Sequence, residues 1–372
     1  MNTRSDQHLI PSRQEETSLL SIVIPCRNEQ EFIGKCLDSI LSSDYPLDRL
    51  EILVVDGLST DGTSRILSSY SERYSNIRVI ENPKRITPAA FNRGIESARG
   101  ELILIMSAHA TYAPDAIRKL ARYSAEFGAE NVGGIWKVLP RDNGYIGRGI
   151  AFALSHVFGI GGARYRLVDE CSEPAWVDTA AYGCYRREVF EKIGLYNEDL
   201  VHSQDIELNL RLESAGGRTL LAPDVVIQYY ARTELSAFTK HNFRNGQWVI
   251  LPFAYSEVMP VAWRHLVPLA FAGSLLVSGI GALFSTISML LFAGILFTYL
   301  LANFAASALI ARREHDVRYL FVMPIVFGIL HLCYGFGSVW GLCRLAGNSS
   351  FWRRVFRLKA AKSSAVLGPG VE

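Results

Sequence analysis

The feature that most constrains this chain is a long stretch without charged side chains, from Leu266 to Ile310. It is about twice as long as the roughly 20 residues that one transmembrane helix needs. It therefore predicts two helices, over residues 266–284 and 287–310, joined by a turn near Phe284. Two buried core helices would fit this stretch poorly, because a soluble helix nearly always carries charges on one face.

A second uncharged run, Tyr319–Cys343, is long enough for a third helix over residues 319–343. Its glycines leave two readings open, a full span or a bent, re-entrant or interfacial segment. The arginines between these runs, Arg312, Arg313 and Arg318, predict that this end of the second helix faces the cytosol. A full third span would place the basic tail, residues 346–372, on the opposite side, against the same tendency, so both readings stay open.

The amino-terminal half is expected to stay in the cytosol. Residues 1–18 are polar, lack the apolar core of a signal peptide and predict a flexible tail. The six cysteines show no metal-ligand spacing and are typical of reduced thiols. A net charge of +2 with 49% hydrophobic residues fits neither a disordered chain nor a nucleic-acid-binding protein. The prediction is a cytoplasmic domain on a multi-pass anchor in the inner (cell) membrane.

The region from residue 19 to about residue 235 alternates short apolar runs with helical patterns. This alternation predicts parallel strands joined by right-handed crossovers, in an α/β sheet with helices on both faces. The expected strands are 19–25, 50–56, 77–81 and a run beginning at Leu102. The expected helices are 29–43, 62–73 and 87–98.

Polar clusters follow three of these strands, at residues 25–29, 56–63 and 107–109. Ligands of parallel sheets bind beyond the carboxyl ends of the strands, so the three clusters are expected to converge on one crevice. A lone histidine after a strand is more often structural, and an Asp-Gly turn is usually only a loop. The inference therefore depends on the alignment of all three clusters.

These segments resemble a known family. SIVIPCRNEQEFIGKCLDSIL, EILVVDGLSTDGT and NPKRITPAAFNRGIESARGE are similar to the family 2 glycosyltransferases of GT-A fold, in the branch of the ExoA-like, succinoglycan-type exopolysaccharide glucosyltransferases. The resemblance covers roughly residues 20–250. It implies a Rossmann-like nucleotide-sugar-binding domain over residues 19–250, before an interfacial segment at 251–264 and a membrane region at 265–345.

The resemblance also implies an activity. We expect inverting transfer of a hexose, first of all glucose, from a nucleotide sugar, first of all a UDP-sugar, to a polyprenyl-linked saccharide. The product would enter exopolysaccharide or cell-surface polysaccharide, with other polysaccharide-assembly proteins as further partners. The motifs are specific for the family and say much less about which sugar is moved.

For the donor, the resemblance implies a nucleotide pocket lined by Pro25, Arg27 and Glu29. It also implies that Asp56 hydrogen-bonds the base or ribose, which suits a carboxylate because it accepts from N–H and O–H donors. The structural alternative for Asp56 is a turn residue at a strand end. Lys84 and Arg85 precede a helix and are candidates for phosphate contacts, although exposed basic residues are more often simply solvated.

For the diphosphate, the family usually presents D-x-D, and ExoA-like members often D-x-H, where this chain has Ser107-Ala108-His109. The resemblance implies that His109 holds a divalent metal, Mn or Mg, that bridges the phosphates beside Ser107. Imidazole accommodates Mn better than Mg. Because Ser107 lacks the carboxylate, we expect weaker metal binding unless another group helps, and metal dependence stays an open question.

For the catalytic base, YNEDLVHSQDIELNLRLESAGG resembles the acidic acceptor-side motif of the family. Asp205 stands at the position of the catalytic carboxylate, and Gln204 stands where glutamate is common. Ser203 is placed to cap a helix whose first turn holds Asp205, and the positive helix end favours the ionised form that a base needs. The structural alternative is that Asp205 only decorates that first turn.

Three further residues are expected on the acceptor side. Asp178 lies in WVDTAAYGCYRREVF, which resembles the segment that shapes the acceptor pocket. Arg244 and Trp248, in FTKHNFRNGQWVI, imperfectly match the Q-x-x-R-W motif of the family. An amphipathic segment at the membrane surface would explain their aromatic and basic character equally well.

Two other functions stay open. A non-catalytic scaffold that binds nucleotide sugars is suggested by Ser107 and Gln204. A processive polysaccharide synthase is the second alternative, against which the small number of membrane helices argues. Turnover of labelled nucleotide sugars separates the enzyme from the scaffold, and product length identifies a processive enzyme.

Overall fold

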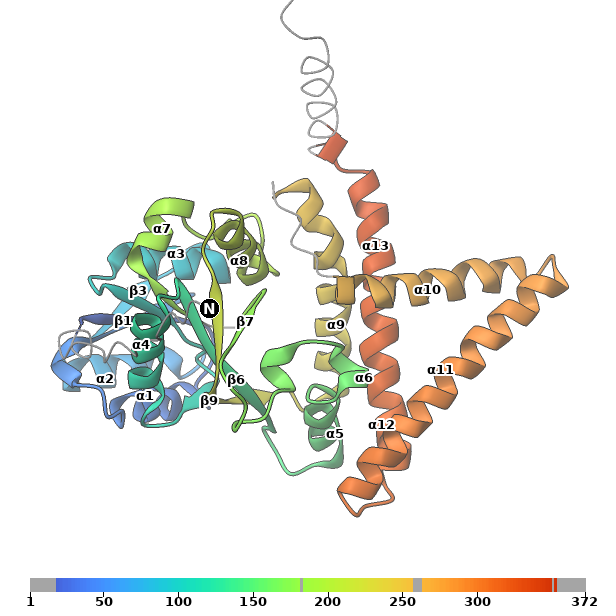
Figure 1. Cartoon of the computed structure of the whole chain (residues 1–372), viewed down its shortest axis with the longest axis horizontal. Coiled ribbons are helices and arrows are strands. Elements are labelled where there is room, and N and C mark those ends of the chain that lie inside the picture. The colour runs from blue at the N-terminus through green and yellow to red at the C-terminus, as the bar shows by residue number, and fades with distance from the viewer. Residues whose placement is uncertain (1–17, 181–182, 257–262, 350, 353–372) are drawn as a thin grey trace, which may run out of the picture. The chain divides into compact units, whose positions relative to one another are not determined.

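A computed structural model describes residues 18–180, 183–256, 263–349 and 351–352 (Figure 1). The chain divides into two compact units, Met1–Leu139 with Ala163–Tyr230, and Pro140–Gly162 with Ala231–Glu372. Most of the two predicted tails, and residues 257–262 of the predicted interfacial segment, lie outside the described residues.

The described part of the first unit contains a nine-stranded sheet whose first half is parallel, in the order β3-β2-β1-β4. Its strands are β1 (Leu20–Cys26), β2 (Leu50–Asp56), β3 (Ile77–Glu81) and β4 (Leu102–Ile105). The crossover helices are α1 (Ile33–Leu41), α2 (Thr63–Arg73) and α3 (Thr87–Ser97). All four expected strands and all three expected helices are confirmed.

The second half of the sheet differs from the prediction of parallel strands only. It continues from β4 in the order β8-β6-β9-β5, and β8 runs antiparallel to both β4 and β6. The strands are β5 (Ala110–Tyr112), β6 (Asn131–Pro140), β7 (Ala175–Val177), β8 (Cys184–Arg186) and β9 (Thr219–Ala231). The sheet is therefore mixed. A three-residue strand such as β8 is too short for a recognisable alternating pattern.

Helices cover both faces of this sheet because its central strands are apolar on both faces. Alternate residues of β1 divide between two cores: Ile22 and Ile24 pack with α1 and α4 (Ala116–Phe127), and Val23 packs on the opposite face. That second core includes α3, α7 (Arg187–Ile193) and α8 (Gln204–Ser214) (Figure 1). At Gly94 of α3 a Cβ atom would lie 2.3 Å from Val23 Cγ1, so only glycine allows this approach.

The described part of the second unit is helical. It comprises α5 (Tyr145–Ala153), α6 (Val157–Ile160), α9 (Leu235–Ile250), α10 (Trp263–Gly281), α11 (Thr286–Arg313), α12 (Tyr319–Gly328), the π-helical turn η5 (Ile329–Cys333) and α13 (Tyr334–Ala346). Three helical runs are long and apolar enough to cross a membrane, at Arg264–Gly281, Thr286–Arg313 and Tyr319–Ala346. The third run is helical throughout, with Pro324 and the turn η5 inside it, and the number of full spans stays a prediction.

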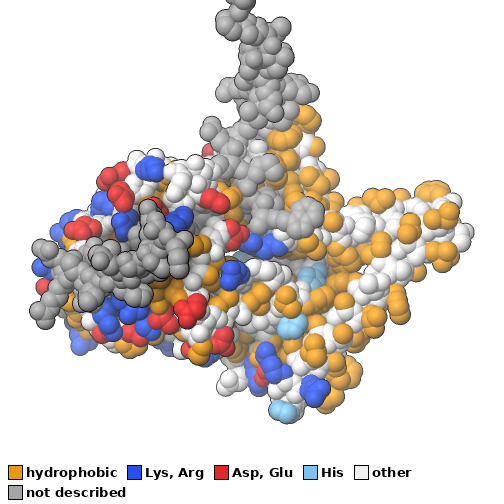
Figure 2. All heavy atoms as spheres, viewed as in Figure 1, with side chains coloured by type: hydrophobic (Ala, Val, Ile, Leu, Met, Phe, Trp, Pro, Cys, Tyr) orange, Lys and Arg blue, Asp and Glu red, His pale blue; other side chains and the backbone are white. Residues whose placement is uncertain are grey.

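The side chains of α11 support contact with lipid. Ile287, Leu290 and Phe297 are 72%, 64% and 68% exposed, and only 6% of the most apolar window of this helix is buried by protein. Figure 2 shows hydrophobic side chains along the helices α10 and α11. Exposed apolar surface of this extent is unfavourable in water and is expected for helices that face acyl chains.

Helix α9 belongs to the second unit, which differs from the predicted domain border at residue 250. The cause is close packing of α9 on α13. A Cβ atom at Gly246 would lie 1.9 Å from the Tyr334 carbonyl oxygen, and one at Gly337 would lie 2.1 Å from the Phe243 carbonyl oxygen. Ser338 Oγ donates a hydrogen bond of 3.1 Å to the Gly246 carbonyl. Glycines at such crossings let two helix backbones approach closely.

Candidate active site

The polar clusters after β1 and β2 are joined by backbone-to-side-chain hydrogen bonds. The Asn28 N–H donates to Ser59 Oγ at 2.9 Å, and the Thr60 N–H donates back to Asn28 Oδ1 at 2.8 Å. The Glu29 N–H donates to Thr63 Oγ1 at 2.9 Å. The carboxyl ends of these neighbouring parallel strands therefore form one polar edge, as the sequence predicts.

The cluster after β4 joins the same edge through a single contact. His109 Nδ1 lies 3.0 Å from Glu29 Oε1, and the two side chains are 24% and 18% exposed. A carboxylate only accepts hydrogen bonds, so Nδ1 carries the proton of this pair. In the neutral imidazole Nε2 then keeps its lone pair, and this pattern of carboxylate and histidine is common behind metal ions.

Ser107 is buried among protein atoms and is only 2% exposed. Its N–H donates to Tyr112 Oη at 2.8 Å, and its Oγ accepts from the His109 N–H at 3.4 Å. Its carbonyl accepts from Cys36 Sγ at 3.4 Å. These contacts shape the turn that presents His109, and the expected contact of Ser107 with the nucleotide sugar stays a prediction.

Asp56 is engaged in the loop after β2. One carboxylate oxygen accepts from Ser59 Oγ at 2.6 Å, and the other accepts from Ser64 Oγ at 3.3 Å. These bonds favour the structural role of Asp56, and its contact with a base or ribose stays a prediction. The Arg27 side chain lies along the same loop, since a Cβ atom at Gly57 would be 3.1 Å from Arg27 Cδ. Pro25 precedes this region as a half-buried residue of β1.

The two basic candidates behave differently. Lys84 forms an ion pair with Glu198, whose other oxygen accepts from Asn92 Nδ2 at 3.2 Å. The hydrogen bond from Lys84 is also the main cause that lowers the pKa of Glu198. Arg85 is exposed, with a left-handed backbone at φ 57°. To bind a phosphate of the donor, Lys84 would have to break its ion pair with Glu198.

Asp205 lies in the first turn of α8, as the sequence predicts. The predicted cap is not formed: Ser203 occupies the N-cap position with φ 61°, and its side chain accepts no hydrogen bond from the helix end. Burial raises the pKa of Asp205, while the N–H of Ile206 and the charge of Arg166 act in the opposite direction. The helix end favours the ionised form, as the sequence predicts, but burial has the larger effect on the pKa, and the role of Asp205 as the base stays a prediction. A raised pKa brings a carboxylate nearer to the working range of a general base.

A row of aromatic side chains leads from His109 to Arg166, and no sequence pattern predicts it. His109 meets the edge of Tyr229 at 5.2 Å between ring centroids, and Tyr229 stacks on Trp136 at 4.4 Å. The Arg166 guanidinium lies 5.0 Å over the Trp136 ring. These residues sit on β9, β6 and the short turn η3 (Arg164–Arg166), and the two strands belong to the antiparallel half of the sheet that the sequence did not predict.

The three acceptor-side candidates lie on other elements than the loops after β1, β2 and β4. Asp178 directly follows β7 and is exposed. Arg244 and Trp248 lie on α9 in the second unit, where the Trp248 ring packs 6.5 Å from that of Tyr255. Their roles toward an acceptor stay predictions.

Within the described residues, no group of three or more His, Cys, Asp or Glu side chains could hold a metal ion. A metal at the His109 edge would thus have the imidazole Nε2 as a protein ligand and would need its other ligands from phosphate oxygens and water. That donor set is compatible with an ion held mainly by a diphosphate.

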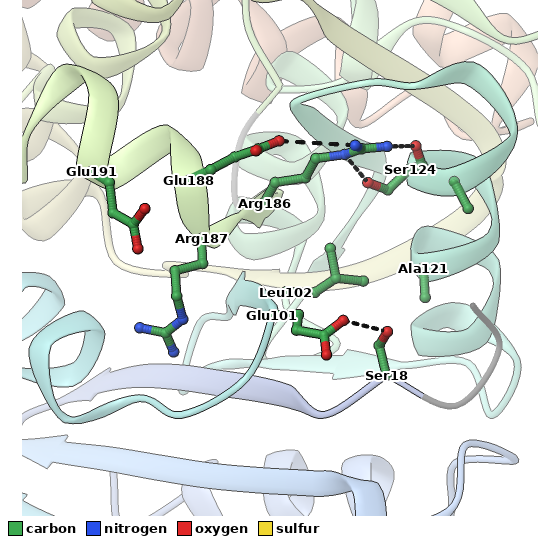
Figure 3. A pocket seen from close by; sticks show the side chains of 10 residues that line it. Ser18, Glu101, Leu102, Ala121, Ser124, Arg186, Arg187, Glu188 and Glu191 are labelled. Carbon is green, nitrogen blue, oxygen red and sulfur yellow. Dashed lines mark hydrogen bonds and ion pairs between the residues drawn. The ribbon is translucent and has the colours of Figure 1, made fainter. Parts of the chain in front are cut away.

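A separate hollow of about 380 Å³ lies at the other ends of the strands (Figure 3). Leu102, which begins β4, lines it, whereas His109 follows the end of β4. Its arginines bond to backbone carbonyls: Arg186 donates to Ser124 at 2.8 Å and Arg187 donates to Gly100 at 2.8 Å. Arg187 Nη2 is a buried donor without a hydrogen-bond partner among the described residues, but Glu101, Glu188 and Glu191 line the same hollow and oppose the binding of an anion.

The mixed α/β sheet with polar loops at its parallel strand ends defines a GT-A fold. Supporting this, the structure of the mannosyltransferase PcManGT from Pyrobaculum calidifontis, solved in complex with GDP-Man and Mn²⁺, superposes with a TM-score of 0.57. The match covers 87% of each chain at 21% sequence identity.

Sequence comparisons identify the family. Residues 21–194 match the family model described as glycosyl transferase family 2. The succinoglycan biosynthesis protein ExoA of Rhizobium meliloti is 31% identical over 266 residues, which cover 70% of this chain and 78% of ExoA. A dolichyl N-acetyl-α-D-glucosaminyl phosphate 3-β-D-2,3-diacetamido-2,3-dideoxy-β-D-glucuronosyltransferase of Methanococcus voltae is 26% identical, over 90% of this chain and 99% of that protein. The chain belongs to glycosyl transferase family 2, in its ExoA-like branch, and is a glycosyltransferase.

Proposed function

We propose that this glycosyltransferase moves a hexose from a nucleotide sugar to a polyprenyl-linked saccharide, with inversion at the anomeric carbon. The observation that carries the proposal is the union of three strand-end loops into one polar edge through Glu29 and His109. A UDP-sugar, first of all UDP-glucose, is the proposed donor. The names of ExoA and of the dolichyl-linked transferase support an acceptor on the path to a polysaccharide or lipid-linked glycan.

The proposed chemistry is a single displacement. A carboxylate oxygen of Asp205 accepts the proton of the acceptor hydroxyl, and that hydroxyl oxygen attacks the anomeric carbon. The bond between this carbon and the diphosphate oxygen breaks, and the nucleoside diphosphate leaves with the electron pair. Attack from the face opposite the leaving group inverts the configuration. The raised pKa of Asp205, caused by burial, supports its role as the base.

The proposed cofactor is Mn²⁺ or Mg²⁺, with Mn²⁺ favoured because the protein ligand is an imidazole. His109 Nε2 would hold the ion, and Glu29 would orient the ring through Nδ1. When bound, a divalent ion neutralises the charge that develops on the leaving diphosphate. Asp56, Arg27 and Pro25 are proposed to bind the nucleoside portion of the donor.

The three long apolar helices are proposed to anchor the enzyme in the inner membrane, with the catalytic unit in the cytosol. Arg312 and Arg313 in the last turn of α11 and Arg318 just before α12 support this orientation. Attachment to the membrane holds the enzyme at the surface where a lipid-linked acceptor is concentrated.

A donor screen tests the proposal. Membranes that contain the full chain are incubated with radiolabelled UDP-glucose, UDP-galactose, UDP-N-acetylglucosamine and GDP-mannose, with an extract of polyprenyl-linked saccharides as acceptor. We expect one donor to label the lipid fraction by one sugar per acceptor, and membranes with Asp205→Asn to label it about a hundredfold more slowly. Binding of a donor without transfer of any sugar would contradict the enzyme and favour the scaffold. Long labelled products would identify a processive synthase.

A further inference from the structure

We infer that Arg166 binds a phosphate group at the reaction site, as a fixed cation that a row of aromatic rings connects to the His109 edge. The inference deepens the proposed function and rests on it. A fixed positive charge would help here, because Ser107 and the His109 imidazole supply little positive charge to neutralise a diphosphate.

The position of Arg166 is set by its aromatic neighbours. Its guanidinium lies 5.0 Å over the Trp136 ring and 5.4 Å over the Tyr165 ring. Trp136 is 8% exposed and is itself fixed by stacking on Tyr229 at 4.4 Å and 19°. Contact of a guanidinium with aromatic rings leaves its N–H donors unpaired, and their planar arrangement matches the oxygens of a phosphate.

The hydrogen-bonding capacity of Arg166 is unused. Its Nε atom is buried and has no hydrogen-bond partner among the described residues. Arginine carries five N–H donors, and a buried donor without an acceptor costs free energy. An anionic ligand that accepts from this edge would remove that cost, so the geometry favours an occupied state.

The surroundings of Arg166 fit the reaction. The row Trp136, Tyr229 and His109 leads to the proposed position of the diphosphate. The charge of Arg166 also acts on Asp205, because burial raises the pKa of this carboxyl while the charge of Arg166 lowers it. A phosphate held by Arg166 would therefore interact electrostatically with the proposed base.

Two substrates carry phosphate to this place, the nucleoside diphosphate of the donor and the phosphate of a lipid-linked acceptor. Both present the same chemistry to a guanidinium. Ligand-induced shifts of the melting temperature of the full chain in detergent separate them, because such shifts need no turnover. The probes are UDP, GDP, uridine, guanosine and undecaprenyl phosphate, each with and without Mn²⁺.

The variants are Arg166→Ala and Arg166→Lys, with Arg164→Ala as the matched control. Arg164 is an exposed arginine of the same η3 turn. A hydrogen-bonded charge pair contributes about 1.5–3 kcal/mol, so Arg166→Ala should weaken binding of the phosphate ligand about tenfold or more. Arg166→Lys, which keeps the charge without the fork, should show a smaller loss and serves as the test if Arg166→Ala does not fold.

The binding measurements distinguish four outcomes for Arg166. Weaker binding of UDP or GDP with unchanged binding of the nucleoside assigns Arg166 to the donor diphosphate. Weaker binding of undecaprenyl phosphate alone assigns it to the lipid acceptor. If the parent binds these ligands and both Arg166 variants bind them as tightly as Arg164→Ala does, Arg166 only packs on Trp136 and the inference is wrong. If the parent itself binds neither UDP nor GDP, the proposed function has failed instead.

Discussion

His109 and Glu29 come from loops after different strands, and their side chains meet with Nδ1 3.0 Å from Oε1. This contact is the direct link between the polar cluster after β1 and the imidazole after β4. It fixes which ring nitrogen carries the proton, and it leaves Nε2 for a ligand. The pair therefore gives the first prediction.

Glu29→Ala should weaken Mn²⁺ binding about tenfold to a hundredfold, the usual effect of losing a carboxylate behind a metal-bound histidine. His109→Ala should abolish Mn²⁺ stimulation of transfer. Electron paramagnetic resonance of free Mn²⁺, titrated into the full chain with UDP present, measures the affinity. Glu31→Gln, at an exposed position of the same loop, is the control. Equal Mn²⁺ affinity in all these variants would remove His109 from the metal site.

Ser107→Asp should tighten Mn²⁺ binding by restoring the carboxylate common in the family. It should also lower the melting temperature without metal, because the position is 2% exposed and a buried carboxylate without a partner is unfavourable. Addition of Mn²⁺ with UDP should restore the lost stability. Melting curves with EDTA and with Mn²⁺ plus UDP check both effects. A variant that melts identically in the two conditions would argue against a metal beside Ser107.

Gly246→Ala should destabilise the second unit, because the added Cβ atom would lie 1.9 Å from the Tyr334 carbonyl oxygen. Overpacking of this kind costs about 1–3 kcal/mol. Gly294→Ala in α11 is the matched control, since no atom lies within 4 Å of its added Cβ. Thermal unfolding in detergent compares the two variants. Equal melting temperatures would mean that α9 and α13 do not pack as closely as described.

The proposed orientation predicts different labelling of the two turns that flank α11. With the native cysteines removed, Ser285→Cys should react with a membrane-impermeant maleimide in intact cells, because it precedes α11 on the outer side. His315→Cys, between Arg313 at the end of α11 and Arg318, should react only after the cells are opened. The reverse pattern would place the catalytic unit outside the cytosol.

Much of the fold is predictable from the sequence. The parallel strands β1, β2 and β4 follow from largely buried runs of four to seven residues, whereas in β3 only Ile77 is buried. Helix α1 follows from its apolar face, where Ile33, Cys36, Leu37 and Ile40 are all buried. The uncharged stretches likewise predict the helices of the second unit. Local patterns of this kind depend on neighbours in the chain, so one sequence is enough to detect them.

The remainder depends on contacts between distant residues. β8 has three residues and pairs with β4, which lies far earlier in the chain. The close packing of α9 on α13 depends on glycines in both helices, which are about ninety residues apart. Neither Arg166 nor Trp136 lies in a recognisable sequence motif. Only the folded sheet places the Arg166 guanidinium over the Trp136 ring. The burial of Asp205, which outweighs the helix end, likewise requires the tertiary structure.

The raised pKa of Asp205 has a consequence for stability. An acid whose pKa is higher in the folded than in the unfolded state destabilises the fold when it ionises, and this cost develops as the pH rises above the unfolded value of about 3.9. Asp205→Asn removes the ionisation. The variant should therefore melt at a higher temperature than the parent at pH 8, with a smaller difference at pH 5. An equal difference at both pH values would contradict the burial of this charge.

The most direct measurement is the transfer rate of Asp205→Asn beside its affinity for the donor. If Asp205 is the base, the variant should bind the nucleotide sugar nearly as well as the parent. Its rate of sugar transfer should be lower by about a hundredfold or more. The acid limb of the parent's pH–rate profile should also disappear in the variant. Near-normal turnover by Asp205→Asn, with an unchanged pH profile, would contradict the assignment of the base and with it the proposed mechanism.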